Sequence, residues 1–430
     1  MKILGIETSC DETAASVVED GARILSNVVV SQIDIFAEYG GVIPEVAARS
    51  HLEAMLPVID KALADASCKW DDIDAIAVTH APGLLGSLLI GTLTARTLAI
   101  LHNKPLYAVH HLKSHVYANW LIIPESENIP LRNAPSLPSS RGSVAPQSPR
   151  RRLCSSEGYF SDSPSFPLLA LVVSGGHTQI LYMPGHNQFE IIGTTKDDAV
   201  GECFDKVAKI LGLPYPGGPS IAKAALKGDA TKYQFPHPKV EGLNFSFSGL
   251  KTAVLRAVQK EVRVSISYPS HKLKELLSEQ QVADFAASFQ KTAVDILVEK
   301  MMMATTQYPD VRSMVVAGGV SANEELRRKF ETVFSSAGLE FLSTSYAGTR
   351  AEPPLRGEPV RSVRNKRVKN SNHVMLQKKQ SQDLLLFFPA PSLSGDNGAM
   401  VAAAAYYEIQ SGVEPTDPYS LNIYPRVKIS

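Results

Sequence analysis

The chain has 430 residues, 44% of them hydrophobic and 20% charged, which is typical of a globular protein with two or more domains. Lysine and arginine together number 43, as do aspartate and glutamate, so the net charge gives no reason to expect wholesale nucleic-acid binding. No apolar run is long enough for a membrane span, and the four cysteines form no CxxC motif or close pair, which argues against a disulfide framework or a thiolate zinc site. We expect a protein without a targeting peptide in a reducing compartment: the cytoplasm or, alternatively, an organellar stroma or matrix.

Two segments share a strand–turn–strand pattern. The first is MKILGIETSCDETAASVVEDGARILSNVVV at the N-terminus, and the second is PLLALVVSGGHTQILYMPG from Pro167. In each, a run of β-forming apolar residues ends in small polar residues and a second strand follows. We interpret the pair as a distant internal repeat, and hence as two related α/β lobes with mixed sheets whose turns face a shared cleft. The alternative is that so common a pattern occurs twice by chance.

Apolar periodicity predicts four long helices. They cover residues 43–64 (with a break near Pro57), 85–102, 200–211 and 279–306. The third carries one apolar stripe and is predicted to end at Gly212. After the strand MVVAG, Ser321 and Glu324 have the spacing of a capping box at the start of a further helix.

Two polar segments interrupt this pattern. Residues 124–166 hold seven Pro and eleven Ser, and residues 350–380 hold nine Lys or Arg against two Glu. Neither composition can bury enough apolar surface to offset the entropy of ordering. We therefore divide the chain into an N-terminal lobe (1–123), a Pro/Ser-rich insertion (124–166), a C-terminal lobe (167–347), a basic insertion (348–382) and a last part (383–430). That last part completes the C-terminal lobe and returns towards the N-terminal one.

The stretch HHLKSH places His111 and His115 four residues apart. On a helix these positions share a face, so both imidazoles could bind one metal ion, while His110 lies on a different face. The alternative is two ordinary polar helix residues, because HxxxH alone is weak evidence. The pair lacks the glutamate of an HExxH motif, so the sequence offers no metalloprotease base.

A metal held by two histidines needs a third ligand, usually a carboxylate. The candidate is Asp396 in SLSGDNGAMVAAAAYYEI. Its turn opens an alanine-rich helix, where small residues permit close approach of the backbone to a ligand and the helix N-terminus favours an anion. The alternative is an ordinary helix cap.

Three glycine-bearing turns resemble phosphate loops, because bare backbone amides can hold phosphate oxygens. Their sequences are VVSGGHTQ from Val172, VVAGGVSAN from Val315 and LPYPGGPS from Leu213. The last turn follows a helix that carries Asp205, whose carboxylate could hold ribose hydroxyls. Ordinary turns are the alternative in each case.

The turn ETSCDET contributes three carboxylates near the N-terminus, on Glu7, Asp11 and Glu12. Clustered carboxylates beside a phosphate loop could hold Mg²⁺ or act as a base. The alternative is a solvated hairpin turn.

Nine motifs carry a resemblance to a known family. GIETSCDETAASVV, EYGGVIPEVAARSH, APGLLGSLLIG, HHLKSHVYA, VVSGGHTQI, GECFDKVAKILGLPYPGGPS, NFSFSGLKTAV, VVAGGVSANEELR and DNGAM follow one another in this order. The chain closely resembles the TsaD family in its bacterial or organellar form, over nearly everything outside the two insertions. These are tRNA N6-adenosine threonylcarbamoyltransferases, once described as O-sialoglycoprotein endopeptidases. The resemblance implies an α/β, two-lobed actin/hexokinase-like fold (ASKHA, duplicated ribonuclease H-like) with the ligand cleft between the lobes.

The resemblance also implies the reaction and the partners. The threonylcarbamoyl group would pass from threonylcarbamoyl-adenylate to N6 of the adenosine 3′ of the anticodon, in tRNAs that read codons beginning with A. A TsaB-like paralogue and a TsaE-like ATPase are the implied partners, TsaC would make the adenylate, and no membrane is involved. The basic insertion is then either a solvated loop or an accessory contact to tRNA or a partner.

By motif match, one divalent metal ion, iron or zinc, is expected on His111, His115 and Asp396, with Mg²⁺ as a further candidate ion. The expected substrate-binding residues are Val173, Ser174, Gly175, Gly176, His177, Asp205, Gly218 and Asn323. Our own hypothesis is that Asp11 or Glu12 removes the N6 proton. Ser394 and Gly395 precede Asp396 where Cys-Thr is commoner in the family.

Three other classes of function remain as alternatives. A metalloprotease is opposed by the missing HExxH base. An ASKHA-type small-molecule kinase would share the fold but has no need of HxxxH. A non-catalytic scaffold resembling the paralogous partner is expected to lack the two histidines and the aspartate.

Overall fold

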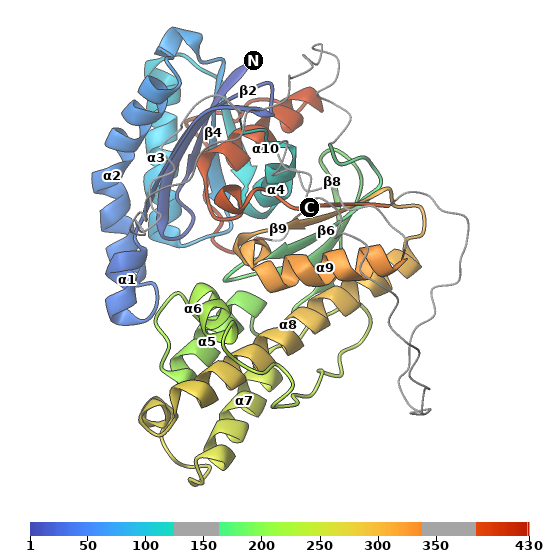
Figure 1. Ribbon diagram of the computed structural model, residues 1–430. Helices are drawn as coiled ribbons and strands as arrows, with labels where there is room; N and C mark the ends of the chain where they lie inside the picture. The colour runs from blue at the N-terminus through green and yellow to red at the C-terminus, as the bar shows by residue number, and fades with distance from the viewer. Residues whose placement is uncertain (124–162, 338–383, 428, 430) are drawn as a thin grey trace, which may run out of the picture.

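The computed structural model describes residues 1–123, 163–337, 384–427 and 429. Most of the Pro/Ser-rich insertion and all of the basic insertion lie outside the described residues. The described part contains two five-stranded sheets with helices packed on their faces (Figure 1). In the same part of the chain, no helix is both long and apolar enough to cross a membrane.

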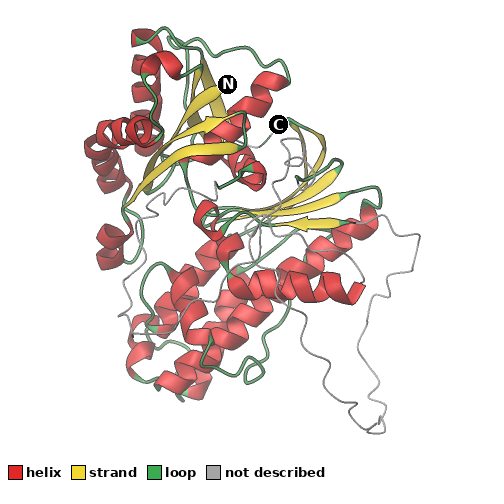
Figure 2. Cartoon of the chain, turned by 45° about the horizontal axis from the view of Figure 1, so that its top comes forward, coloured by secondary structure: helices red, strands yellow, loops and turns green. Residues whose placement is uncertain are grey.

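The two sheets have the same topology. In the first, β1 (Lys2–Glu7), β2 (Glu12–Glu19) and β3 (Arg23–Ser31) form an antiparallel meander, and β4 (Ala75–Ala81) and β5 (Leu106–His110) run parallel to β1, in the order β3-β2-β1-β4-β5. In the second, β6 (Leu168–Val173), β7 (Thr178–Gly185) and β8 (Gln188–Thr194) form the meander, and β9 (Ser313–Ala317) and β10 (Leu385–Phe387) run parallel to β6, in the order β10-β9-β6-β7-β8. The predicted two-lobed α/β architecture is confirmed, and Figure 2 shows the sheets as separate yellow layers.

Alternation along β1 divides the first lobe into two layers of core. Leu4 and Ile6 pack beneath α2 (Pro44–Asp65) and α3 (Leu85–Leu101), while Ile3 faces the opposite side. That opposite side is covered by α4 (His111–Tyr117) and α10 (Gly398–Gln410), and α4 also packs against β6. Helices α4 and α10 therefore lie between the two sheets (Figure 1), and α1 (Ile33–Tyr39) precedes α2 at the edge of the lobe.

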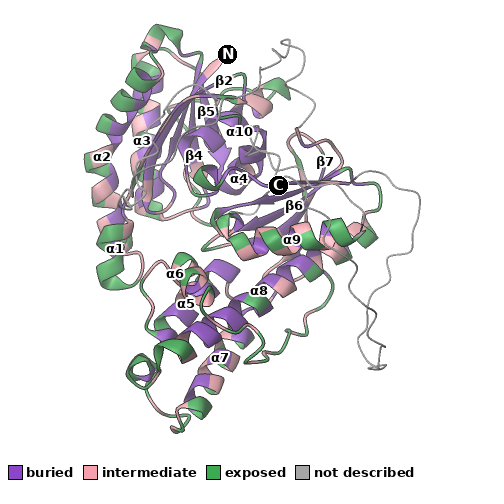
Figure 3. Ribbon diagram, in the orientation of Figure 1, coloured by how far each residue is buried: buried purple, intermediate pink, exposed green. Residues whose placement is uncertain are grey.

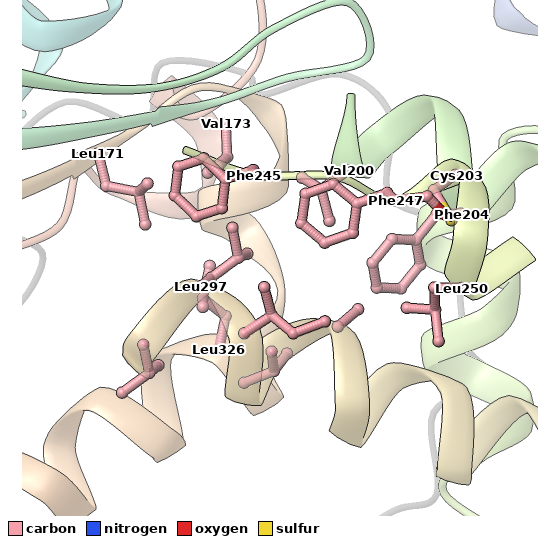
Figure 4. Close-up of a cluster of buried hydrophobic side chains, with 14 of the residues drawn as sticks. Leu171, Val173, Val200, Cys203, Phe204, Phe245, Phe247, Leu250, Leu297 and Leu326 are labelled. Atoms are coloured by element: carbon pink, nitrogen blue, oxygen red, sulfur yellow. Dashed lines mark hydrogen bonds between the residues drawn. The ribbon is translucent and has the colours of Figure 1, made fainter. Parts of the chain in front are cut away.

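The outer face of the second sheet carries the remaining helices. These are α5 (Val200–Leu211), α6 (Gly217–Ala225), α7 (Ser248–Glu261), α8 (Glu279–Gln307) and α9 (Glu324–Ala337). Their core includes Leu171, Phe245, Phe247 and Leu297 (Figure 4). Figure 3 shows the strands largely buried and the outward faces of α2 and α9 exposed.

The predicted helices agree with α3, α5 and α8 to within one residue at each end, and Gly212 ends α5 with a φ of 73°. The predicted break at Pro57 is wrong, because α2 continues through this residue. Pro57 lies on the exposed face, while Met55, Val58 and Ile59 on either side of it are buried. Their packing outweighs the cost of about 3 kcal/mol for an interior proline.

The predicted capping box at Ser321 is also wrong. Ser321 lies in a 3₁₀ turn, Gly319–Ala322, and α9 begins only at Glu324. Asn323 caps the helix instead: its Oδ1 accepts a hydrogen bond of 3.0 Å from the backbone N–H of Leu326. The 3₁₀ turn shifts the helix cap by two residues, from Ser321 to Asn323, which the spacing of Ser and Glu alone does not reveal.

Helix α10 lies unusually close to β1. A Cβ added to Gly5 would lie 2.1 Å from the carbonyl oxygen of Gly398, and one added to Gly398 would lie 2.6 Å from the carbonyl oxygen of Gly5. Ala402, whose nitrogen would lie 2.7 Å from the same Cβ on Gly5, is fully buried in this contact. The small residues that the sequence suggested for approach to a ligand therefore serve the packing of this helix on the sheet.

Candidate active site and metal centre

A cleft of about 1580 Å³ lies between the two lobes. It is bordered by the turn after β1, the turn between β6 and β7, the start of α6, the residues before α9 and the turn before α10. Segments more than 380 residues apart in the chain, at Asp11 and Asp396, thus meet at one cavity. The predicted site residues that line it are Asp11, Glu12, His111, Ser174, Gly175, Gly176, His177, Asp205, Gly218, Asn323 and Asp396.

Two predicted site residues do not line the cleft. His115 lies behind His111 with only 1% of its surface exposed. Val173 is the last residue of β6, and alternation directs its side chain into the core beside Phe245 (Figure 4). Only the backbone of Val173 reaches the turn, so its side chain cannot contact a ligand in the cleft.

His111, His115 and Asp396 come together at the inner end of the cleft. One ligand atom from each lies within 4.8 Å of the others. Asp396 Oδ1 is 3.2 Å from His115 Nε2 and 3.7 Å from His111 Nε2. Although His115 Nε2 is buried and near this oxygen, it forms no hydrogen bond of acceptable geometry among the described residues. Two imidazole nitrogens and a carboxylate oxygen directed at a common point fit a divalent cation.

Short local structures position these three side chains. Strand β5 ends at His110 and α4 starts at His111, so the two imidazoles lie one helical turn apart with ring centroids separated by 4.6 Å. At α10 the cap is Asn397, whose Oδ1 accepts a hydrogen bond of 3.0 Å from the Met400 N–H. Because Asn397 caps the helix, the carboxylate of Asp396 is left for another role.

The charges around the three residues favour a cation. Burial lowers the pKa of His111, but the carboxylates of Asp396 and Glu7 outweigh burial and raise it to about 9. Burial likewise raises the pKa of Asp396, and the two imidazoles outweigh it and hold that pKa well below its usual range. A positive charge is therefore stabilised here, whether it is carried by a proton or by a metal ion.

The turn between β6 and β7 presents bare backbone to the cleft. The N–H of Ser174 donates to the carbonyl oxygen of His177 at 2.9 Å, and Ser174 Oγ accepts from the N–H of His177 at 3.2 Å. A Cβ on Gly175 or Gly176 would meet nothing within 4 Å. The start of α5 packs on this turn at Gly201, where a Cβ would lie 2.5 Å from the Ser174 carbonyl oxygen. A helix N-terminus and free amides on one turn suit an anionic group.

Comparison with known proteins places the chain in a family. Residues 23–135 and 153–351 match the family model of TsaD, tRNA N6-adenosine threonylcarbamoyltransferase. The chain belongs to the TsaD family. A curated protein of this name from Symbiobacterium thermophilum is 41% identical over 412 residues, which are 96% of this chain and 92% of that protein. Another from Dehalococcoides mccartyi is 46% identical over 330 residues, 76% of this chain and 84% of that protein. The chain is accordingly an enzyme of the transferase class.

A solved structure supports the fold. The structure of HypF from T. kodakarensis aligns with 96% of this chain and 48% of its own length, with a TM-score of 0.51 and 12% sequence identity. Identity at this level informs on the fold alone. It confirms the predicted ASKHA-type architecture of this TsaD-family member.

Asp205 and Asn323 have structural partners as well as a place on the cleft. Asp205 Oδ1 accepts a 2.6 Å hydrogen bond from the Gly217 N–H, which ties α5 to the first residue of α6. Asn323 caps α9 and donates through Nδ2 to Gln290 Oε1 at 3.0 Å. Any contact to a ligand would therefore use side chains that are already fixed in orientation.

Glu7 differs from its neighbours in the ETSCDET turn. It ends β1 and is fully buried, whereas Asp11 and Glu12 line the cleft. Its Oε2 lies 3.1 Å from His111 Nδ1 and accepts a 2.6 Å hydrogen bond from Thr79, while Oε1 accepts from the Ser9 N–H at 2.5 Å. A carboxylate on Nδ1 directs Nε2 of His111 towards the point that His115 Nε2 and Asp396 also face. Alternation along β1 could have revealed this position in the sequence. Ile6 faces the core beneath α2 and α3, so the next residue, Glu7, must face the opposite side, where α4 lies.

Glu7→Gln is expected to lower the affinity for Zn²⁺ by about 10- to 100-fold, because the neutral amide no longer holds His111 in the required tautomer. Competition titration against a chromophoric chelator measures the change. Glu19→Gln, at the exposed end of β2 where the side chain pairs with Arg23, is the matched control and should bind Zn²⁺ like the wild type. Unchanged affinity in Glu7→Gln would contradict this role.

Proposed function

We propose that the chain transfers the threonylcarbamoyl group of threonylcarbamoyl-adenylate to N6 of the adenosine 3′ of the anticodon, in tRNAs reading codons that begin with A. In this step N6 bonds to the carbamoyl carbon, the bond from that carbon to the adenylate oxygen breaks, and AMP and one N6 proton leave. The observation that carries the proposal is the cleft itself. It places the His111, His115 and Asp396 cluster and the bare amides of the β6–β7 turn at one cavity.

The residue types suit this chemistry. N6 of adenine is a weak nucleophile because its lone pair is delocalised into the ring, so the reaction depends on an activated donor, close positioning and charge stabilisation. His111, His115 and Asp396 would hold an iron or zinc ion, which when bound would polarise the transferred carbonyl. The backbone amides at Gly175 and Gly176 would hold the adenylate phosphate.

Glu12 is the better placed of the two candidate bases. Burial, and then the charges of Asp11 and Asp396, raise its pKa well above the ordinary value. A carboxylate with a raised pKa is a stronger base towards the N6 proton, although it is ionised over a narrower, higher pH range. Cys10 also lines the cleft, but burial raises the pKa of its thiol well above the usual value, so it stays protonated and is no nucleophile.

Glu12→Gln is expected to slow transfer by about 100- to 1000-fold and to remove the limb of the pH profile that rises with Glu12 ionisation. Initial rates of threonine incorporation between pH 5.5 and 9 would show both effects. Glu12→Asp should retain part of the rate and the rising limb. Full activity in Glu12→Gln would assign the proton acceptor elsewhere, with Asp11 as the next candidate.

The decisive test of the function is incorporation of labelled threonine into tRNA. The chain would be mixed with threonine, ATP, bicarbonate, TsaC, TsaB and TsaE, and His111→Ala would be run beside it. Incorporation that the variant loses supports both the transferase activity and the place of His111 in it. No incorporation by the folded chain, alongside a working bacterial TsaD control, would count against the proposal.

An apolar ridge on the first lobe would seat the TsaB-like partner. Leu85, Leu89 and Leu93 follow one another at intervals of four along α3, and Leu52 and Leu56 extend the ridge on α2; all five are at least 43% exposed. Exposed leucines gathered on two neighbouring helices indicate an interaction surface. The ridge begins directly after Leu84, which lines the cleft, so a partner bound on it would lie next to the proposed site.

Leu89→Asp is expected to weaken binding of TsaB by about tenfold or more, because it buries a charge in an apolar contact. Titration by isothermal calorimetry measures the affinity. Ile266→Asp, at a position on the other lobe that is 72% exposed, is the control. If Leu89→Asp and Ile266→Asp bound TsaB with equal affinity, the ridge would not be part of the interface.

A further inference from the structure

Arg327 on α9 joins two turns that approach the cleft separately. Its Nε donates to the carbonyl oxygen of Ser321 at 2.7 Å. Its Nη2 donates to the carbonyl oxygen of Pro389 at 2.8 Å and lies 3.4 Å from Ser394 Oγ. The guanidinium carbon lies 4.8 Å from the ring centroid of Phe388, which fixes the plane of the group.

The two turns leave neighbouring parallel strands at the same edge of the second sheet. Residues 318–323, which we call the β9 turn, follow β9 and end at Asn323. Residues 388–396, which we call the β10 turn, follow β10 and end at Asp396. Strands β9 and β10 pair in parallel, so one side chain can reach both turns.

Arg327 is suited to fixing distances between these turns. The guanidinium is rigid and planar, so its separate N–H groups hold two carbonyl oxygens at a set spacing. All three acceptors named above are neutral oxygens, so these bonds position the backbone and neutralise no charge. Burial lowers the pKa of Arg327 to about 10, and the side chain remains charged at neutral pH.

Each turn ends at a residue of the proposed site. Asn323 follows Ser321 by two residues in the same turn, so a shift of the Ser321 backbone would be passed along the chain to Asn323. Ser394 lies two residues before Asp396, and its hydroxyl also donates to the Ala390 carbonyl oxygen at 3.3 Å. The guanidinium of Arg327 therefore links Asn323 to Asp396 through its hydrogen bonds to the two turns.

We propose that Arg327 is a positioning residue that couples the β9 turn to the β10 turn, so that a ligand ordering one turn favours binding at the other. The inference rests on the proposed function, in which Asn323 at the end of the β9 turn would contact the adenylate and Asp396 at the end of the β10 turn would bind the metal ion. Without the guanidinium, the carbonyls of Ser321 and Pro389 lose their shared donor and the two turns move independently. Coupling of this kind is reciprocal, since each ligand changes the affinity of the other by the same factor.

The test is a pair of titrations on the full chain, with AMP as the probe of the β9 turn and Co²⁺ as the probe of the metal centre. In the wild type, AMP should increase Co²⁺ affinity by a factor of about 5 or more, and Co²⁺ should increase AMP affinity equally. In Arg327→Met both affinities should fall by about tenfold and the coupling factor should approach one. Arg327→Lys keeps the charge but lacks the planar fork, so it should also lose the coupling.

Two further variants make the test specific. Lys329→Met removes a cation from the same helix, where Lys329 pairs with Asp295, and should keep wild-type coupling. Ser394→Ala removes one acceptor of Arg327 without altering α9, so the coupling factor should fall part of the way towards one. This variant tests the inference even if Arg327→Met does not fold.

The inference would be overturned by wild-type coupling in folded Arg327→Met or Ser394→Ala, or by a wild type that binds both probes independently. Loss of thermal stability in Arg327→Met with unchanged affinities and coupling would likewise leave only a packing role. A wild type that binds neither AMP nor Co²⁺ would instead count against the proposed function.

Discussion

Asp396→Asn should reduce threonylcarbamoyl transfer by about a thousandfold or more, which corresponds to about 4 kcal/mol of transition-state stabilisation. The substitution keeps the size of the side chain but removes the negative charge that faces His111 and His115. Folding should persist, because Asn397 and not Asp396 caps α10. Labelled-threonine incorporation measures the rate, and elemental analysis of the purified variant measures its metal content.

Metal removal gives an independent check of the same prediction. A chelator should inactivate the wild type to the level of Asp396→Asn, and added Zn²⁺ or Fe²⁺ should restore the wild type but not the variant. Asp310→Asn, whose carboxylate accepts an exposed hydrogen bond from Tyr182, is the matched control. Full activity in the metal-free wild type would show that the reaction does not need a metal ion at His111, His115 and Asp396.

The sequence was most informative where a pattern depends on one element alone. The apolar stripe of α5, closed by Gly212, needed no knowledge of distant contacts, and its bounds were predicted without error. The repeated strand–turn–strand pattern likewise predicted two related lobes with mixed sheets, and the two sheets have the same strand order. In both cases the periodicity of buried residues determines the element directly.

Predictions failed where tertiary packing decides between local alternatives. Pro57 would end an isolated helix, yet Val58 and Ile59 hold α2 against the sheet beyond it. Ser321 and Glu324 have the spacing of a capping box, but the 3₁₀ turn before α9 moves the cap to Asn323. The spacing of residues along the sequence gives no information on the packing of α2 or on the 3₁₀ turn before α9.

The candidate site was predictable as a set of turns, but the roles within it were not. The HxxxH spacing indicated His111 and His115 as candidate ligands, and the structure brings Asp396 to them from the far end of the chain. Three carboxylates in one turn looked equivalent, although Glu7 is buried behind His111 and the others face the cleft. Arg327 had no sequence signal, because its partners are backbone carbonyls from two separate turns.

Gly5→Ala is expected to lower the free energy of unfolding by about 3 kcal/mol, a large part of the total stability of a typical domain. The new Cβ would lie 2.1 Å from the Gly398 carbonyl oxygen and 2.7 Å from the Ala402 nitrogen. Both are backbone atoms of α10, so the helix must move away from β1. Urea denaturation followed by far-UV circular dichroism measures the loss.

The same substitution tests how Asp396 is held. Asp396 lies two residues before α10, so a displaced helix should carry it away from His111 and His115 and lower Co²⁺ affinity in the folded protein as well as stability. Gly249→Ala is the control: a Cβ there meets nothing within 4 Å in α7, and alanine favours the helix by about 0.5–1 kcal/mol. If Gly5→Ala lowered the stability but left Co²⁺ affinity unchanged, the turn at Gly395 would have to absorb the shift of α10. The position of Asp396 would then depend on that turn and on Arg327 more than on the packing of α10.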